Sequence, residues 1–449
     1  MNAQSNIQHF SDTFRANDSK IAFIWRDKSY DYSSILRKID HWRSELKAIR
    51  PGLIVGIEGD FYPDSIAILF VLIERNVIIV PMDINQAKKN EKKYEIAQIE
   101  ILIRFKTESE IEILNLDVID RKHELYDVIV KREAPGLVLF TSGSSGQPKA
   151  ALHDFSKLLS KFLVKRKALI TINFLLFDHW GGLNTLFHIL SNGGTVVILE
   201  NRNPDYVCEL IQKFKVELLP TSPTFLNMLL LSRAYERNSI ESLKIISYGS
   251  EPMPENVLKH LNQRFPQIIL QQTYGLIELG VMRSKSEDNN SLWVKIGGEG
   301  YQTRVVDGML QIKSDSAMVG YLNAESPFTD DGWFVTGDAV EVRDDYFKIL
   351  GRKSEIINVG GEKVYPQEVE NVILENDFVI DAFIFGEVNP ITGKMVSAKI
   401  VIKEGMDEKE AVFRIKQMCR QKLASFKVPM RITVTTESLH GHRFKKTRK

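Results

Sequence analysis

Short apolar runs alternate along the chain with amphipathic segments. Residues 53–57, 77–81 and 137–140 are apolar almost throughout, which predicts strands buried inside a sheet. Residues 32–46 and 64–75 carry apolar side chains at helical spacing and predict helices that flank these strands. A strand–helix–strand rhythm of this kind is typical of a mostly parallel sheet covered by helices.

The same rhythm continues on both sides of the central apolar run. Further strands are predicted at residues 100–105, 168–177, 194–199 and 216–220, and further helices at residues 183–191 and 206–214. Residues 284–291 are polar and predict a loop. From residue 296 to residue 342, short strand-like runs with many glycines are typical of a small antiparallel unit.

A change of pattern near residue 350 predicts a domain boundary. Beyond it, Pro366 begins a helix with acidic residues in its first turn, and a second helix at 411–423 precedes a strand at 431–435. A chain of 449 residues is too long for one ordinary core. We therefore predict an α/β fold with a large N-terminal region, residues 1–350, in which several subdomains hold parallel sheets flanked by helices. A small α+β domain, residues 351–449, follows it.

The composition narrows the functional classes. A hydrophobic fraction of 43% and a charged fraction of 26% are those of a globular protein, and a net charge of +1 disfavours a general nucleic-acid or acidic-membrane binder. Residues 66–80 are the most apolar segment, but charges interrupt them, so no membrane span is expected. Residues 1–18 lack the pattern of a signal peptide, and Cys208 and Cys419 are predicted to be reduced core thiols. We expect a cytoplasmic protein.

The central apolar run ends in a loop of small residues closed by a lysine. The loop consists of Thr141, Ser142, Gly143, Ser144, Ser145, Gly146 and Lys149, with Gln147 and Pro148 between the last two. Glycines let successive N–H groups point into one concavity, which suits phosphate oxygens, and Lys149 adds a positive charge. The loop is not a Walker A motif, because no Ser or Thr follows the lysine. A flexible surface loop is the alternative. Asp154 is expected to begin a helix that continues to Leu163.

Five further motifs follow in a fixed order. They occupy residues 248–252, 272–278, 331–338, 350–363 and 443–448. Together with the loop at residues 141–149, they resemble the motifs of the adenylate-forming superfamily, which comprises acyl-CoA synthetases, adenylation domains and luciferases. The resemblance covers about residues 30–448. It implies the superfamily's fold, with a C-terminal domain that is mobile about a hinge.

The resemblance assigns the nucleotide contacts. It implies that Tyr274 packs on adenine, that Glu278 holds Mg²⁺ on the phosphates of ATP, and that Asp338 accepts hydrogen bonds from the ribose hydroxyls. Arg352 is expected to reach the nucleotide. The remaining residues expected to line this site are Gly249, Ser250, Glu251, Thr273 and Gly275.

The C-terminal region is expected to supply a lysine and a glycine pair. By resemblance, Lys445 bridges the substrate carboxylate and the α-phosphate, and Lys446 is the rival by one position. Phe444 stands where the superfamily has glycine. Gly360 and Gly361 would let the backbone close on a pantetheine arm, because no Cβ intrudes.

The activity implied is ATP-dependent activation of a carboxylic acid to an acyl-adenylate, followed by transfer to a pantetheine thiol. Coenzyme A is the expected acceptor, since no carrier domain is part of the chain, and an acyl carrier protein is the alternative. A non-catalytic nucleotide-binding relative also stays open, because the chain departs from the superfamily at Ala150, Ile277, Ser354 and Phe444. No sequence feature favours a luciferase-like oxygenase.

The acid pocket is expected around Asp178, His179 and Gly182. Amino-acid adenylating relatives have an aspartate after phenylalanine at this place, so Asp178 keeps an amino-acid adenylating enzyme as an alternative. A buried carboxylate without a cationic partner is costly, and therefore Asp178 needs either a ligand ammonium or a protein donor such as His179. We expect the pairing within the protein, and hence a non-amino aromatic or aliphatic acid.

Overall fold

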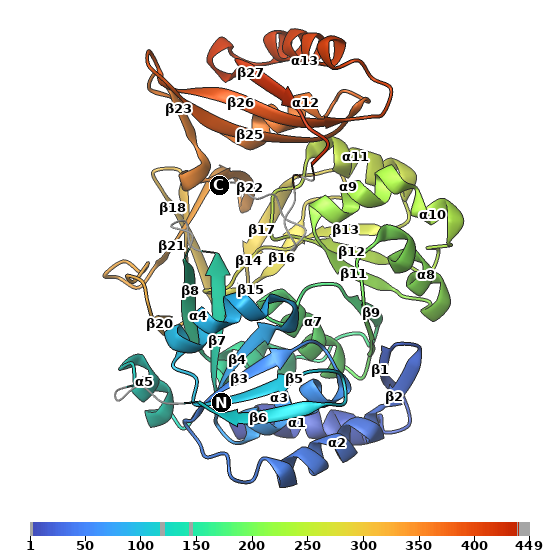
Figure 1. Cartoon of the computed structure of the whole chain (residues 1–449), viewed down its shortest axis with the longest axis vertical. Coiled ribbons are helices and arrows are strands. Elements are labelled where there is room, and N and C mark those ends of the chain that lie inside the picture. The colour runs from blue at the N-terminus through green and yellow to red at the C-terminus, as the bar shows by residue number, and fades with distance from the viewer. Residues whose placement is uncertain (1–2, 117–121, 143–146, 438, 440–449) are drawn as a thin grey trace.

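The computed structural model describes residues 3–116, 122–142, 147–437 and 439. Figure 1 shows a body built around large sheets, with a smaller C-terminal unit lying over it. The predicted mixed α/β architecture is confirmed. Within the described residues, no helix is long and apolar enough to cross a membrane.

The first sheet of the body contains the central apolar run. In sheet order its strands are β20 (Gly320–Tyr321), β8 (Pro148–Asp154), β7 (Gly136–Ser142), β4 (Ile78–Asp83), β3 (Ile54–Gly59), β5 (Ile101–Phe105) and β6 (Ile111–Asn115). The inner strands β7, β4, β3 and β5 are parallel, and the outer pairs are antiparallel. Associated helices are α1 (Ala3–Ala16), α2 (Tyr32–Glu45), α3 (Pro63–Glu74), α4 (Ala87–Ala97), α5 (Leu125–Lys131) and α6 (Phe155–Leu159). Helix α3 is buried almost throughout because it packs between layers.

The second sheet continues the parallel pattern. In sheet order its strands are β13 (Ile269–Gln272), β12 (Ile245–Tyr248), β11 (Leu218–Thr221), β9 (Ile170–Asn173), β10 (Thr195–Ile198), β1 (Ile21–Trp25) and β2 (Lys28–Asp31). Its helices are α7 (Trp180–Leu190), α8 (Pro204–Phe214), α9 (Pro223–Ser232), α10 (Ala234–Arg237) and α11 (Glu255–Arg264). All its described strand pairs are parallel except β1–β2, as short apolar strands linked by helices predict.

An antiparallel unit joins the body to the C-terminal unit. In sheet order it consists of β16 (Arg283–Ser286), β17 (Trp293–Gly297), β22 (Tyr346–Arg352), β21 (Phe334–Arg343), β19 (Met309–Ser314) and β18 (Tyr301–Val306). A short hairpin of β14 (Gly275–Leu276) and β15 (Gly280–Val281) precedes it. This unit carries the predicted motifs at residues 331–338 and 350–352.

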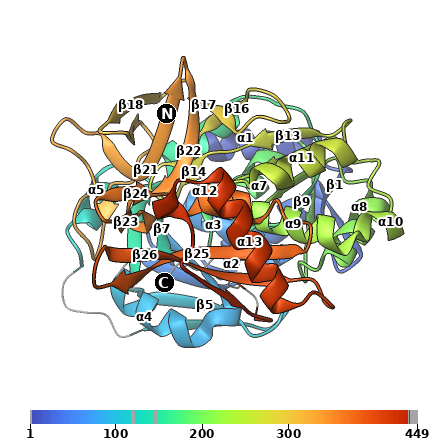
Figure 2. The same ribbon diagram turned by 90° about the horizontal axis from the view of Figure 1, so that it is seen from above.

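The C-terminal unit has its own apolar core. Its strands are β24 (Glu362–Val364), β23 (Ile357–Val359), β26 (Gly393–Ile402), β25 (Val379–Asn389) and β27 (Arg431–Val434), and its helices are α12 (Pro366–Ile373) and α13 (Glu408–Lys422). Figures 1 and 2 place α13 at the outer surface of this unit. Amides of Asn227 and Asn256 in the body donate to the carbonyls of Ile380 and Leu374, at 3.1 and 2.7 Å. The exact division at residues 350 and 351 stays a prediction.

Asp154 is the N-cap residue of helix α6, as predicted, and the helical segment reaches Leu163, although only its first five residues are α-helical and Ser160–Leu163 form a 3₁₀ turn. Residues 148–154, between the phosphate loop and this helix, form strand β8 and pair antiparallel with β7, which the sequence analysis did not predict. Part of the predicted loop at 284–291 is strand β16, since it pairs with β17. The prediction of buried, free cysteines is confirmed for Cys208 and Cys419.

Candidate functional site: a nucleotide end and an acid end

Three predicted nucleotide residues meet between β21, β22 and the segment before β14. The hydroxyl of Tyr274 donates to Oδ2 of Asp338. Nε of Arg352 lies 3.3 Å from Oδ1 of the same carboxylate, because Asp338 and Arg352 face each other in the β21–β22 ladder. The cluster therefore unites residues that are up to 78 positions apart, counted from Tyr274 to Arg352.

The carboxylate at the centre of this cluster is buried. Asp338 is 6% exposed, and burial raises its pKa. The guanidinium of Arg352 and the hydroxyl of Tyr274 offset part of that rise, because both stabilise the charged form. Tyr274 and Arg352, which both belong to the predicted motifs, thus fix the position of the Asp338 carboxylate.

A second cluster surrounds Glu278. The hydroxyl of Tyr321 donates to Oε1 of Glu278, and Nζ of Lys149 lies 5.3 Å from the centre of the Tyr321 ring. The guanidinium of Arg352 also interacts electrostatically with the Glu278 carboxylate, so Arg352 belongs to both clusters. Tyr321 was missed by the sequence analysis, since it lies in a two-residue strand, β20, outside the recognised motifs.

The two ends of the predicted phosphate loop pair with each other in strands β7 and β8. Thr141 pairs with Lys149 and Ser142 with Pro148 across β7 and β8, whereas Gly143, Ser144, Ser145 and Gly146 lie outside the described residues. Asn323 holds the start of β8, because its side chain accepts from the Ala150 N–H and donates to the Pro148 carbonyl, both at 2.9 Å. The strand pairing therefore determines where the Lys149 side chain begins.

The segment after β12 approaches the segment after β13 closely. A Cβ on Gly249 would lie 2.5 Å from Oγ1 of Thr273, so only glycine fits there. Ser250 has a φ of +70°, an uncommon value for a residue with a side chain. Oε1 of Glu251 accepts from the N–H of Thr224 at 2.7 Å, at the start of α9. Gly275 lies on β14, opposite Val281.

The predicted acid residues lie at the start of α7. Asp178 is 3% exposed, and its Oδ2 lies 3.6 Å from Nζ of Lys93, a buried lysine of α4. Nδ1 of His179 accepts from the N–H of Gly181 at 3.1 Å and so caps α7. A Cβ on Gly182 would meet the Leu176 carbonyl oxygen at 2.2 Å, which explains the glycine. Asp178 therefore has a cationic partner within the protein, as expected. That partner includes Lys93, which the sequence analysis did not consider.

The glycine pair of the C-terminal unit lies in the β23–β24 turn. Gly360 and Gly361 have φ values of +61° and +96°, which favour glycine. The Gly361 N–H donates to Oδ1 of Asn358 at 2.9 Å. Lys445 and Lys446 lie outside the described residues, so the choice between them stays a prediction.

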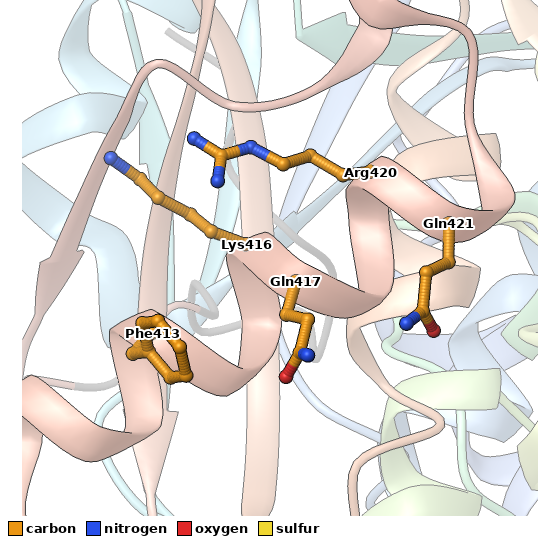
Figure 3. A pocket seen from close by; sticks show the side chains of 5 residues that line it. All are labelled: Phe413, Lys416, Gln417, Arg420 and Gln421. Carbon is orange, nitrogen blue, oxygen red and sulfur yellow. The ribbon is translucent and has the colours of Figure 1, made fainter.

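A groove elsewhere on the C-terminal unit does not belong to this site. It has a volume of about 430 Å³ and lies along the outer face of α13. Figure 3 shows its lining residues, which are Phe413, Lys416, Gln417, Arg420 and Gln421. None of the predicted site residues within the described part of the chain lines it.

Comparison with known proteins gives the family. The family model for AMP-binding enzymes matches residues 10–322, and the model for the AMP-binding enzyme C-terminal domain matches residues 368–448. The chain is 27% identical to a 2-succinylbenzoate–CoA ligase of Bacillus licheniformis over 65% of its own length, and 26% identical to an indoleacetate–CoA ligase of Aromatoleum aromaticum over 69%. These matches span 64% and 65% of the relatives' own lengths.

A solved structure shares the fold. The anthranilate CoA ligase AuaEII, in complex with anthranoyl-AMP, superposes with a TM-score of 0.85 at 18% identity, over 99% of this chain and 97% of that one. The first family model alone covers more than half of the chain. The chain belongs to the AMP-binding enzymes of the adenylate-forming superfamily.

Proposed function

We propose that the protein is an AMP-forming acid–CoA ligase that activates an aromatic or aliphatic carboxylic acid. The observation that carries this proposal is the joint cluster of Tyr274, Asp338 and Arg352, which faces Glu278. In bound ATP, Tyr274 would pack on the adenine, Asp338 would accept hydrogen bonds from the ribose hydroxyls, and Arg352 would reach the nucleotide. The names of the relatives, which are ligases of aryl acids, support this choice of reaction.

In the first half-reaction, an oxygen of the substrate carboxylate bonds to the α-phosphorus of ATP. The bond from that phosphorus to pyrophosphate breaks, and pyrophosphate leaves. Two anions must approach each other, so the site needs positive charge where negative charge builds up. Lys149 would bind the β- and γ-phosphates, and Lys445 would bridge oxygens of the α-phosphate and of the substrate carboxylate.

In the second half-reaction, the pantetheine sulfur bonds to the carbonyl carbon of the adenylate. The bond from that carbon to AMP breaks, AMP leaves, and the thiol proton passes to solvent. The turn at Gly360 and Gly361 would line the approach of the thiol once the C-terminal unit has rotated.

The donor set fits Mg²⁺ bound together with ATP. Magnesium is usually held by one or two carboxylates together with substrate phosphates. Glu278 offers one carboxylate, and Tyr321 orients it through Oε1. The ion would neutralise phosphate charge in this position.

Pyrophosphate exchange that depends on a carboxylic acid tests the proposal. We expect exchange with aryl or medium-chain acids, and acyl-CoA when coenzyme A alone is added. Measurable adenylate without acyl-CoA would favour an acyl carrier protein as acceptor. Nucleotide binding without exchange, over benzoates, fatty acids and amino acids, would instead identify a non-catalytic relative.

A further inference from the structure

Lys161 is a partly buried cation that the activities above do not use. It lies in the 3₁₀ turn after α6, and its Nζ donates to the Val281 carbonyl at 2.9 Å. The ammonium also lies 5.2 Å from the centre of the Phe162 ring and 5.9 Å from that of Trp180. Among the described residues, no carboxylate pairs with Lys161, and the Val281 carbonyl is its one hydrogen-bond acceptor.

The surroundings of Lys161 are cationic or neutral. Arg283 lies close enough to add to the effect of burial, and together they lower the pKa of Lys161 to about 7. Burial also lowers the pKa of His188 to about 4, with a further contribution from Lys161. An ammonium has three donors, so two of them lack a protein acceptor in the described part of the chain.

A second donor nearby also lacks a partner. Trp180 is 2% exposed, and its Nε1 has no hydrogen-bond acceptor among the described residues. A Cβ placed on Gly280 would lie 3.3 Å from that nitrogen, so the indole N–H is next to β15. Buried indole N–H groups usually find an acceptor. Two donors without acceptors at one place indicate a missing acceptor.

The position of these donors connects them to the proposed substrate. Trp180 directly follows Asp178 and His179, the predicted acid residues. Val281 is paired with Gly275 of the predicted nucleotide motif, and paired residues of an antiparallel ladder lie about 5 Å apart. Lys161 thus contacts both the α7 end and the strand beside the nucleotide motif.

We infer that Lys161 and the Trp180 indole bind a second carboxylate of the acid substrate, so that the preferred substrate is a dicarboxylic acid. One carboxylate is activated, and the other remains as an anion at Lys161. A carboxylate supplies the lone pairs that both donors need and the negative charge that this region lacks. The inference rests on the proposed function, because it concerns the acid of that same reaction.

The test compares each diacid with its own monomethyl ester in acid-dependent pyrophosphate exchange. Terephthalic and suberic acids are suitable, since one has an aryl and the other an alkyl spacer, and benzoic and octanoic acids serve as the simple monoacids. For at least one spacer we expect kcat/KM to favour the diacid by about ten- to a hundredfold over its ester, as a charge-assisted hydrogen bond allows.

Variants then assign the preference to this site. Lys161→Met should remove it, Lys161→Arg should keep most of it, and Trp180→Phe should lower it severalfold, with the KM for ATP unchanged. Lys165→Met, at an exposed lysine four positions later, is the matched control and should behave like the parent. A ratio within one variant cancels any loss of folded protein.

The failures are distinguishable. A parent that exchanges pyrophosphate equally well with diacids and esters overturns the inference and leaves the proposed function standing. The inference is also overturned, and the proposed function left standing, if Lys161→Met lowers the activity with the diacid and with its ester by the same factor. A parent that exchanges with none of these acids overturns the proposed function, and the inference with it.

Discussion

The candidate site has two parts that are built differently: a nucleotide end, where Asp338 lies, and an acid end, where Asp178 lies. At the nucleotide end, Tyr274, Asp338 and Arg352 satisfy one another, and all of them lie in recognisable motifs. At the acid end, Lys93 comes from α4, Lys161 from the turn after α6 and Asp178 from the start of α7. The comparison indicates that the residues of the nucleotide end lie in motifs that a sequence reader can recognise, whereas the two lysines proposed for the acid end lie outside any such motif.

The difference is also one of electrostatics. The Asp338 carboxylate receives an arginine and a hydroxyl, so its charge is compensated within the cluster. Lys161 has no described carboxylate partner and is surrounded by aromatic rings and an arginine. A buried charge is retained where something pairs with it, and a substrate group can be that partner.

The largest effect is expected from the buried ion pair of the acid end. Asp178→Ala leaves Lys93 buried without this carboxylate, which should lower the free energy of unfolding by about 3–5 kcal/mol. Urea denaturation measures the change. Asp330→Ala, at an exposed aspartate, is the control and should be close to neutral.

A second variant makes this prediction stricter. Lys93→Met combined with Asp178→Leu removes both charges and should recover most of the lost stability. If Asp178→Ala is as stable as the parent, the pair is not structural. If the parent activates an α-amino acid and Asp178→Ala does not, Asp178 binds the ammonium group of the substrate.

How far the sequence leads can be seen at particular residues. The parallel sheets followed from apolar runs, and the Asp338 cluster followed from motifs. Helix α1 was missed although Ile7, Phe10 and Phe14 are spaced as on one helix face and are buried. Strand β8 was missed for a different reason: its pairing with β7 is a tertiary fact that its mixed sequence does not encode locally.

The acid end was harder to predict than the nucleotide end. Nothing in the polar sequence of α4 distinguishes Lys93 from its neighbouring lysines, although it is 5% exposed. Lys161 similarly lies among several basic residues. Which lysine is buried, as Lys93 is, or partly buried, as Lys161 is, depends on how α4, α6 and α7 pack, and a linear motif holds no information on that packing.

The next effect separates the two half-reactions. Lys445→Ala should slow adenylate formation by about a hundred- to a thousandfold, because a charge that meets developing negative charge is lost. Thioester formation from a supplied acyl-adenylate should persist. Single-turnover assays of each half-reaction measure this split, and normal adenylation by Lys445→Ala together with failure by Lys446→Ala would move the role to Lys446.

The smallest effect should be confined to the nucleotide end. Asp338→Ala removes the acceptor proposed for the ribose hydroxyls and leaves Tyr274 and Arg352 without their shared carboxylate, so the KM for ATP should rise about ten- to a hundredfold. The KM for the acid and the diacid preference should stay as in the parent, since Lys161 and Trp180 are untouched. Initial rates over a matrix of ATP and acid concentrations separate the two constants. Equal increases in both would mean that the two ends are coupled through the fold, and an unchanged KM for ATP would reduce Asp338 to a structural partner of Arg352.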